Sequence, residues 1–410
     1  MANKFVTLED LEVKGKKVLI RVDVNVPMKD GKITNDDRIV KSAPTIKELS
    51  DKKAKVIVIS HLGRPAGKGY EEEFSLKPVA LALEKAVGKK VAFAKDCIGE
   101  ETKKLIDKME DGEILMLENV RFYAEESKND PKFTAKLAEL GDLYISDAFS
   151  AAHRAHSSTE GLAHLLPHAA GRLMEAELKA LEQALGNPKK PVLAIIGGAK
   201  ISTKLDVLHN LVKKVDYIIV GGGMANTFLY AKGNDIGKSL CEKNMKDECL
   251  KIIEEAKRHN CTLVLPVDAR IALTLEKNVT TKNIMHGSLP EGYEIFDSGD
   301  QSIESFINLI KNVKTLIWNG PLGVFEVTPF DTATFSLAKA AAALTKEGKL
   351  VTIAGGGDTV SALQIAGVYN DFTYVSTAGG AFLEWMEGKQ LPGVICLEKD
   401  DNKKDKQGTK

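Results

Sequence analysis

Polar and charged residues follow four short apolar segments in the first half of the sequence. The segments are 18–22, 56–59, 114–117 and 143–145, and the polar or charged residues after them that could bind a ligand are Asp23, Asn25, His61, Arg64, Arg121 and Arg154. If the segments are parallel strands of one sheet, their carboxyl ends meet at one edge, where open α/β sheets bind ligands. The sequence therefore predicts a single site built from four strand ends.

Arginine is scarce in this chain and gathers near these segments. Only eight of the 57 basic residues are arginine, and five of the eight are Arg21, Arg38, Arg64, Arg121 and Arg154. A guanidinium binds carboxylate or phosphate through two parallel hydrogen bonds, which lysine cannot do. We therefore predict a pocket for a small ligand with two or more anionic groups. The alternative is that each arginine forms a separate structural salt bridge.

Glycine takes the corresponding positions in the second half. Glycine-rich turns at 197–200, 221–223, 319–323 and 355–359 each follow a predicted strand. Glycine lets backbone N–H groups approach phosphate oxygens, and a helix N-terminus adds positive potential. Asp358 is placed to bind a magnesium ion carried by such phosphates. A single turn of this kind could be only a tight connection, but four at one sheet edge predict a nucleotide site.

Competing motifs fail on their spacing. A dinucleotide fingerprint starting at Gly221 would need glycine where the chain has Asn226. The segment from Gly233 to Ser239 has three residues between its glycines where a P-loop has four. His164 and His168 lie one helical turn apart without an obvious acidic or cysteine companion, so we interpret them as packing or surface residues.

The elements that must position these residues are short β-branched strands alternating with helices. Strands are predicted at 18–22, 56–59, 91–93, 114–117, 143–145, 192–196, 217–220, 262–265, 315–318, 350–353 and 372–375. Continuous apolar runs are typical of strands buried on both faces of a parallel sheet. The prediction is an α/β protein with two doubly wound, Rossmann-like parallel-sheet domains that close about a hinge.

A helix joins the two predicted domains. Met174, Leu178, Leu181 and Leu185 form one apolar stripe, and Gly186 ends it. We predict a first domain at 1–170, the connecting helix at 171–186, a second domain at 187–390, and a segment at 391–410 with a polar tail. The alternative is a crossover helix inside one larger sheet.

Composition excludes several classes of function. The 410 residues include 57 basic and 57 acidic side chains, so no net charge draws the chain to nucleic acid or to an anionic membrane. Five scattered cysteines argue against a disulfide framework, and no secretory signal or long apolar run is present. We expect a cytoplasmic protein with no nucleic-acid or membrane partner. An anion pocket and a nucleotide pocket in separate, closing domains predict a kinase.

The chain resembles phosphoglycerate kinases along nearly its whole length. The matching segments are RVDVNVP at 21–27, SHLGRP at 60–65, ENVRF at 118–122, DAFSAAHRAHSS at 147–158, GGAK at 197–200, WNGPLGVFE at 318–326 and GGGDT at 355–359. The resemblance implies reversible phosphoryl transfer from 1,3-bisphosphoglycerate to ADP, giving 3-phosphoglycerate and ATP with Mg²⁺ as the cofactor. It also implies a monomer, and a C-terminal segment that returns to the first domain.

The resemblance also assigns residues to roles. The phosphoglycerate site would contain Asp23, Asn25, Arg38, His61, Leu62, Gly63, Arg64, Arg121 and Arg154. The nucleotide site would contain Gly198, Ala199, Lys200, Lys204, Gly222, Gly223, Asn319, Pro321, Gly323, Val324, Glu326, Gly356, Gly357, Asp358 and Thr359. Arg38, Lys204, Gly379 and Gly380 would meet the transferred phosphoryl group, and Asp358 would bind the magnesium ion.

One departure concerns the turn nearest the transferred group. The family usually has glycine where this chain has Ala378. If position 378 needs a positive φ, alanine would strain the turn. Two other functions stay open from the residues alone, namely a non-catalytic two-domain binding protein and a kinase for a different carboxylate.

Overall fold

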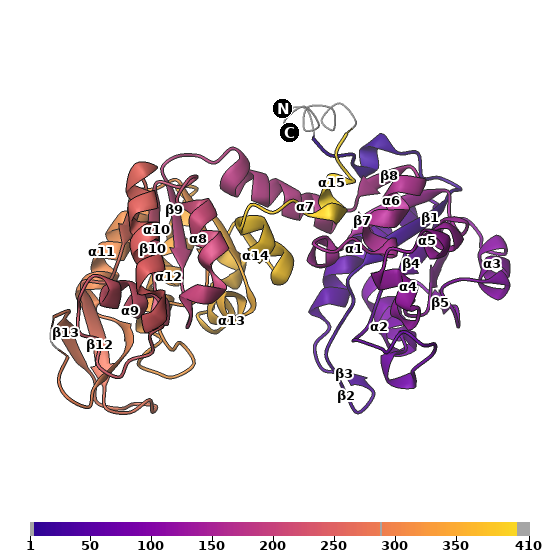
Figure 1. Ribbon diagram of the computed structural model, residues 1–410. Coiled ribbons are helices and arrows are strands. Elements are labelled where there is room, and N and C mark those ends of the chain that lie inside the picture. The colour runs from indigo at the N-terminus through magenta and orange to yellow at the C-terminus, as the bar shows by residue number, and fades with distance from the viewer. Residues whose placement is uncertain (1–3, 288, 400–410) are drawn as a thin grey trace. The chain divides into compact units, whose positions relative to one another are not determined.

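The computed structural model describes residues 4–287 and 289–399, which form two compact units (Figure 1). One unit contains the described residues up to Leu178 and those from Gln390 onward, and the other contains Lys179–Lys389. The division falls within α7 (Arg172–Leu181), which continues as a π-helical turn, η6 (Glu182–Gly186). The predicted connecting helix at 171–186 corresponds to these two elements. The polar tail predicted beyond residue 399 lies outside the described residues.

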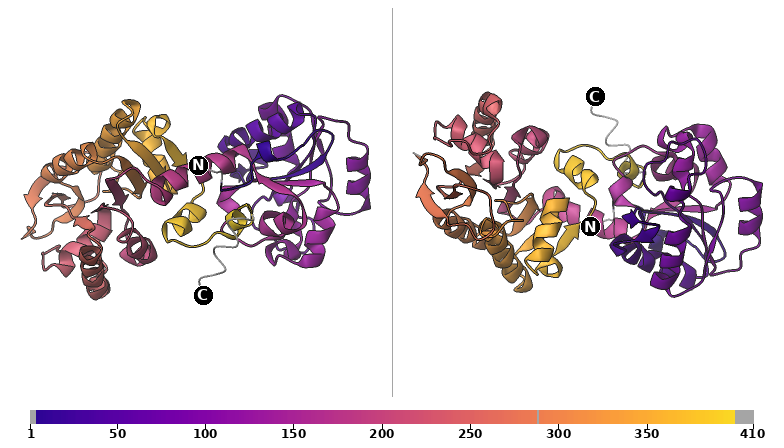
Figure 2. Two further views of the ribbon diagram at one scale, coloured as in Figure 1. Left: turned by 90° about the horizontal axis from the view of Figure 1, so that it is seen from above. Right: turned by 90° about the horizontal axis from the view of Figure 1, so that it is seen from below.

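The first unit is built on a six-stranded parallel sheet. Its strands, in spatial order, are β5 (Val91–Phe93), β6 (Ile114–Met116), β4 (Lys55–Ile59), β1 (Lys17–Val22), β7 (Leu143–Asp147) and β8 (His168–Ala170). Central β1 pairs in parallel with β4 and β7, and every residue from Val18 to Val22 is buried. Helices cover both faces of this sheet (Figure 2).

The helices of the first unit divide between those two faces. They are α1 (Asp37–Asp51), α2 (Lys77–Val87), α3 (Glu100–Asp107), α4 (Ala124–Ser127), α5 (Pro131–Ala138), α6 (Leu162–Leu165) and α15 (Pro392–Ile395). Val18, Ile20 and Val22 point into one core cluster with residues of α1 and α2. Because successive strand residues alternate between faces, Leu19 and Arg21 point the other way. That face contains the turn η5 (Ser157–Gly161), whose Ser158 bonds Arg21.

The second unit repeats the plan with a second six-stranded parallel sheet. Its strands, in spatial order, are β11 (Thr262–Val264), β10 (Tyr217–Val220), β9 (Val192–Ile196), β15 (Thr315–Asn319), β16 (Val351–Gly355) and β17 (Tyr374–Ser376). Its helices are α8 (Leu205–Leu211), α9 (Gly222–Ala231), α10 (Lys246–Arg258), α11 (Asp300–Lys311), α12 (Thr332–Lys346), α13 (Gly357–Ile365) and α14 (Gly380–Met386). The predicted fold class, with two doubly wound parallel sheets, is confirmed. Among the described residues, no helix is long and apolar enough to cross a membrane.

Three further strand features were not predicted. The second unit also has an antiparallel sheet of β13 (Lys282–Met285), β12 (Asp268–Ala272) and β14 (Glu294–Ser298). The first unit has an edge strand, β8, and a small hairpin of β2 (Met28–Lys29) and β3 (Lys32–Ile33). These strands are short, and β13 is polar and mostly exposed, so they lack the apolar runs that marked the central strands.

The C-terminal segment belongs to the first unit. Val6 N donates to Leu397 O at 3.0 Å, and Phe5 forms a β-bridge with Glu398. Gly393 N donates to Ala152 O at 2.9 Å, just after the turn that follows β7. The chain therefore enters the second unit through α7 and returns to the first unit at its end.

Candidate active site

A chain of hydrogen bonds links the predicted anion-binding residues of the first unit. Arg38 Nη1 lies 2.7 Å from Asp23 Oδ2 and 3.3 Å from Asn25 O. Ser150 also donates to Asp23 Oδ2, and Asn25 Oδ1 accepts from Gly63 N at 2.8 Å. Burial raises the pKa of Asp23, but the charge of Arg38 and other neighbours outweighs it and the pKa falls below its usual range. Asp23 is therefore a carboxylate that fixes Arg38.

The loop after β4 is held in the same way. Arg121 Nη1 donates to Gly63 O at 3.0 Å, and Asn119 Nδ2 donates to Leu62 O at 2.8 Å. Gly63 has φ +62°, and a Cβ there would lie 2.4 Å from the ring of Phe74. Glycine is thus required at this position, and the loop carries Arg64 directly after it.

Arg64 and Arg154 are the exposed arginines of this edge. Arg154 Nε donates to His153 Nε2 at 3.0 Å, and its charge acts on Arg121. Burial, followed by the charges of Arg21 and Arg154, lowers the pKa of Arg121 to about 10. Such mutual repulsion concentrates positive potential where an anion can neutralise it.

Arg21 differs from the other four arginines because its side chain is buried, with 1% of its surface exposed. It bonds Ser158 Oγ, Val22 O and the ring of His61. Of the five arginines predicted to converge on an anion pocket, Arg21 is therefore enclosed by the fold. As a residue inside β1 rather than beyond its end, it lies behind the pocket.

In the second unit, Lys204 and Asn319 meet at the end of β15. Lys204 Nζ donates to Asn319 Oδ1, and Asn319 Nδ2 donates to Gly355 O at 2.8 Å. Gly320 N donates to Thr359 Oγ1 at 2.7 Å. Burial lowers the pKa of Lys204 to about 8, although Asp358 and Glu387 act in the opposite direction. The ends of β15 and β16 are thus joined around one ammonium group.

The glycine turns allow backbone segments to lie in contact. A Cβ on Gly197 would lie 1.9 Å from Pro321 O, and a Cβ on Gly222, which has φ +66°, would lie 2.6 Å from Gly198 O. The turns after β9, β10 and β15 therefore pack against one another through bare backbone. No other residue type fits there without displacing a neighbouring turn.

Two further glycines begin helices. Gly356 (φ +97°) precedes α13 and Gly379 (φ +55°) precedes α14. The left-handed residue of the second turn is thus Gly379, and Ala378 is not among the residues with positive φ. The anticipated strain at Ala378 does not occur in this structure.

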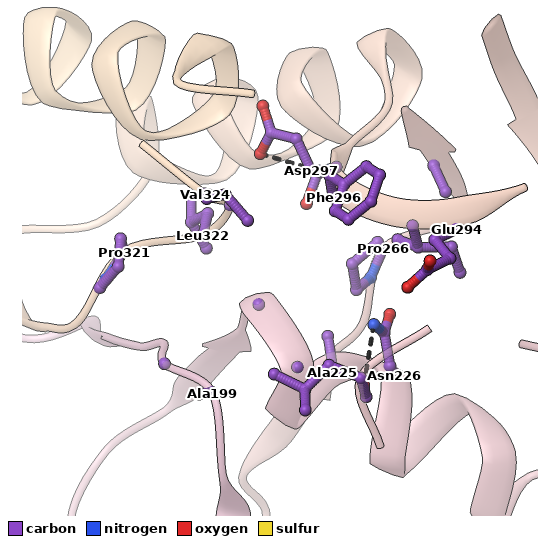
Figure 3. A pocket seen from close by; sticks show the side chains of 18 of the residues that line it. Ala199, Ala225, Asn226, Pro266, Glu294, Phe296, Asp297, Pro321, Leu322 and Val324 are labelled. Atoms are coloured by element: carbon purple, nitrogen blue, oxygen red, sulfur yellow. Dashed lines mark hydrogen bonds between the residues drawn. The ribbon is translucent and has the colours of Figure 1, made fainter. Parts of the chain in front are cut away.

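A cavity of about 350 Å³ opens beside these turns (Figure 3). The predicted nucleotide residues that line it are Gly198, Ala199, Gly222, Gly223, Pro321, Gly323, Val324, Glu326 and Asp358. The other predicted nucleotide residues, which the structure places at neighbouring strand ends, are Lys200, Lys204, Asn319, Gly356, Gly357 and Thr359.

Sequence reasoning missed one wall of this cavity. Pro266, Glu294 and Phe296 line it from the region of the antiparallel sheet (Figure 3). Leu240, from the loop after α9, lines it as well. Asp297 also lines the cavity, and burial raises its pKa well above the usual value. These residues belong to no recognisable motif. In the sequence, the one hint of their role was the presence of apolar residues between polar ones in these segments.

The fit of a magnesium ion can be judged from the donors present. In the described residues, no group of three or more His, Cys, Asp or Glu side chains could hold a metal ion. Asp358 is exposed at the first turn of α13 and reaches the cavity. One carboxylate at the edge of this cavity suits Mg²⁺, which keeps several waters and binds through one or two carboxylates plus phosphates.

The fold and these two sheet edges define a two-unit α/β phosphotransferase. The model of the phosphoglycerate kinase family matches residues 8–389. The chain belongs to the phosphoglycerate kinase family.

Relatives cover almost the whole chain. Phosphoglycerate kinases from Bradyrhizobium diazoefficiens and Rhodopseudomonas palustris are each 58% identical to it, over 97% of this chain and 99% and 100% of their own. The solved structure of phosphoglycerate kinase from Coxiella burnetii has a TM-score of 0.90 at 43% identity, covering 96% of this chain and 98% of its own. The Pyrococcus horikoshii enzyme gives a TM-score of 0.78 at 31% identity, with the same coverage.

Proposed function

We propose that the arginine-lined edge of the first unit binds 3-phosphoglycerate or 1,3-bisphosphoglycerate and that the glycine-lined edge of the second unit binds ATP or ADP. The phosphoryl group passes between the acyl phosphate and ADP, as expected of this family in glycolysis. The observation that carries the proposal is that the two sheet edges present different chemical groups. One edge presents Arg38, Arg64, Arg121 and Arg154, and the other presents bare backbone beside a cavity.

No general base is needed for the reverse reaction. The accepting oxygen of 3-phosphoglycerate belongs to a carboxyl group with a pKa of about 3.5, so it is ionised near neutral pH. Asp23 and His61 are therefore assigned to positioning. Asp23 fixes Arg38 through the 2.7 Å ion pair.

Catalysis then depends on neutralising and aligning the moving phosphoryl group. Arg38 is assigned to this group from the first unit. Lys204 and the N–H groups at Gly379 and Gly380 are assigned to it from the second unit. When bound, Mg²⁺ supplies charge neutralisation on the nucleotide phosphates, and Asp358 is the residue that would hold it. Asn319 orients the Lys204 ammonium through its Oδ1.

Transfer requires the two units to close together about a hinge and to exclude water from the phosphoryl group. All assigned residues come from one chain, so a monomer is sufficient. A cytoplasmic location stays a prediction.

A coupled assay tests this function. The full chain with 1,3-bisphosphoglycerate is expected to form ATP only when ADP and Mg²⁺ are both added. ATP formation without ADP, or no ATP at all, contradicts the proposal. A binding protein without activity would still bind 3-phosphoglycerate in calorimetry. A kinase for another carboxylate would consume ATP with that acid but not with 3-phosphoglycerate.

A further inference from the structure

A buried row of side chains lies behind the arginine-lined edge and ends at His61. Arg21 Nη2 lies 2.8 Å from His61 Nδ1, and Arg21 Nε donates to Ser158 Oγ at 2.9 Å. Ser158 Oγ lies 2.5 Å from Glu126 Oε1, and Ser158 N donates to Glu126 Oε2 at 3.0 Å. The exposed fractions of Arg21, His61 and Glu126 are 1%, 6% and 1%, so water does not compete for these bonds.

The protons in this row can be assigned from chemistry alone. A guanidinium has five N–H donors, no acceptor, and cannot lose a proton in a protein. Its contact with His61 therefore requires Nδ1 to be the acceptor, with no proton on that nitrogen. A ring without a proton on Nδ1 is neutral and carries its single proton on Nε2. By the same reasoning, Ser158 Oγ accepts from Arg21 and gives its own proton to Glu126.

The charges around His61 act in the same direction. Arg21 on β1, Arg121 on the turn after β6 and Arg38 on α1 all disfavour an imidazolium, whereas Asp23 favours one. Burial is the largest cause, the charge of Arg21 is the next, and together they hold the pKa of His61 well below its usual value. Geometry and electrostatics thus agree on a neutral ring.

We propose that Arg21 is a positioning residue that holds His61 as a neutral ring with its proton on Nε2, so that this sheet edge contains a donor of fixed direction and no charge. Glu126 and Ser158 hold Arg21 in turn. The positive charge offered to the anion then comes from guanidinium groups alone and does not change near neutral pH. The link to phosphoglycerate rests on the proposed function, whereas the state of the ring does not.

The state of the ring can be measured directly in the wild-type full chain. Nitrogen NMR of ¹⁵N-histidine-labelled protein, assigned with a His61→Gln variant, distinguishes the two tautomers and the imidazolium. We expect His61 to keep an unprotonated Nδ1 and a protonated Nε2 from pH 5.5 to 8. Titration of His61 within that range, or a proton on Nδ1, overturns the proposal whether or not the protein is a kinase.

Variants then test whether Arg21 is the cause. Arg21→Met removes the donor to Nδ1, and Arg172→Met removes an arginine of the same unit that bonds Glu48 and Glu9 instead. In Arg21→Met, which keeps the burial but removes the nearest positive charge, His61 Nδ1 is expected to become protonated at a clearly higher pH than in wild type. The ratio of the KM for 3-phosphoglycerate at pH 6 to that at pH 8 is expected to change at least about threefold from wild type, with a smaller change in kcat. Arg172→Met should leave both measurements as in wild type.

A second variant guards against a folding failure of Arg21→Met. Ser158→Ala removes only the support of Arg21 Nε and leaves the contact with Nδ1 possible. It is expected to give an intermediate result, with Nδ1 still unprotonated at pH 7 but protonated at a higher pH than in wild type. If the His61 signals of both folded variants follow wild type at every pH, Arg21 does not control the ring.

Discussion

Replacing Lys204 by alanine should affect the rate of transfer far more than the binding of nucleotide. The ammonium is half-buried and held by Asn319 at the junction of two strand ends. A unit charge about 4 Å from the developing phosphoryl charge is worth about 4 kcal/mol at an effective dielectric constant of 20. Loss of one such donor from a preorganised site typically costs about 10²–10³ in kcat. We therefore expect a 100- to 1,000-fold fall in kcat and less than about a tenfold change in the Kd for ATP.

The assay is steady-state ATP consumption with 3-phosphoglycerate, paired with calorimetric titration of ATP. Lys232→Ala is the matched control, because Lys232 is exposed at the end of α9 and outside the glycine turns. The control should keep kcat within about twofold of wild type. A kcat for Lys204→Ala within threefold of wild type, or an equal loss in the control, refutes the role of Lys204.

The pH dependence of kcat/KM for ATP gives an independent test of the role of Lys204. Burial lowers the pKa of Lys204 to about 8, so the charged form predominates below that pH and is lost as the pH rises through it. The value of kcat/KM for ATP is expected to fall above pH 8. Lys204→Arg keeps its charge at every accessible pH and should lose this alkaline decline, although it is slower overall. A decline that persists in Lys204→Arg belongs to another group.

Three further predictions concern other parts of the chain. Gly197→Ala should lower the free energy of unfolding by about 2 kcal/mol or more because its Cβ meets Pro321 O, whereas Gly357→Ala, with nothing within 4 Å, should change it by less than about 0.5 kcal/mol. Equal denaturation midpoints would contradict this. Burial raises the pKa of Asp147 to about 6, so its contribution to stability is present below about pH 4 and lost as the pH rises through 6. As the pH rises from 4 to 8, the free energy of unfolding of Asp147→Asn should increase relative to that of wild type by up to about 3 kcal/mol. A difference in melting temperature that stays constant over this range would count against the prediction. Arg38→Ala should reduce kcat at least about 100-fold while the Kd for ATP stays within about threefold, and unchanged turnover would remove Arg38 from the reaction.

The central strands could be predicted because the same residues satisfy two constraints. Val192–Ile196 and Thr315–Asn319 are buried throughout; the first is an unbroken apolar run, and the second has three consecutive apolar residues at its centre. Their ends carry the functional residues, and the parallel pairing of β9 and β15 brings Gly197 beside Asn319. Predicting the strands was therefore enough to predict which residues lie at the functional edge of the sheet.

The far wall of the cavity could not be predicted because it depends on tertiary packing. Strand β13 is polar and exposed, and β14 is stabilised by pairing with β12 rather than by its own pattern. Glu294 and Phe296 line the cavity only because this antiparallel pairing folds beside α9. No local spacing marks them.

Arg21 shows a different limit of prediction from the sequence. The scarcity of arginine correctly drew attention to it, but its position inside β1 means that its side chain lies on one face of the sheet and not beyond the end. The partners that bury it, Ser158 and Glu126, are more than 100 residues away in the sequence. Their proximity is a property of the fold.

A crystal structure of the full chain with 3-phosphoglycerate and a non-hydrolysable MgATP analogue tests the division between the two units most directly. The account predicts the phosphoglycerate on Arg38, Arg64, Arg121 and Arg154 in the first unit, and the nucleotide in the second unit between Gly198 and Phe296. Both ligands bound in one unit, or a nucleotide bound against the arginines, would contradict it.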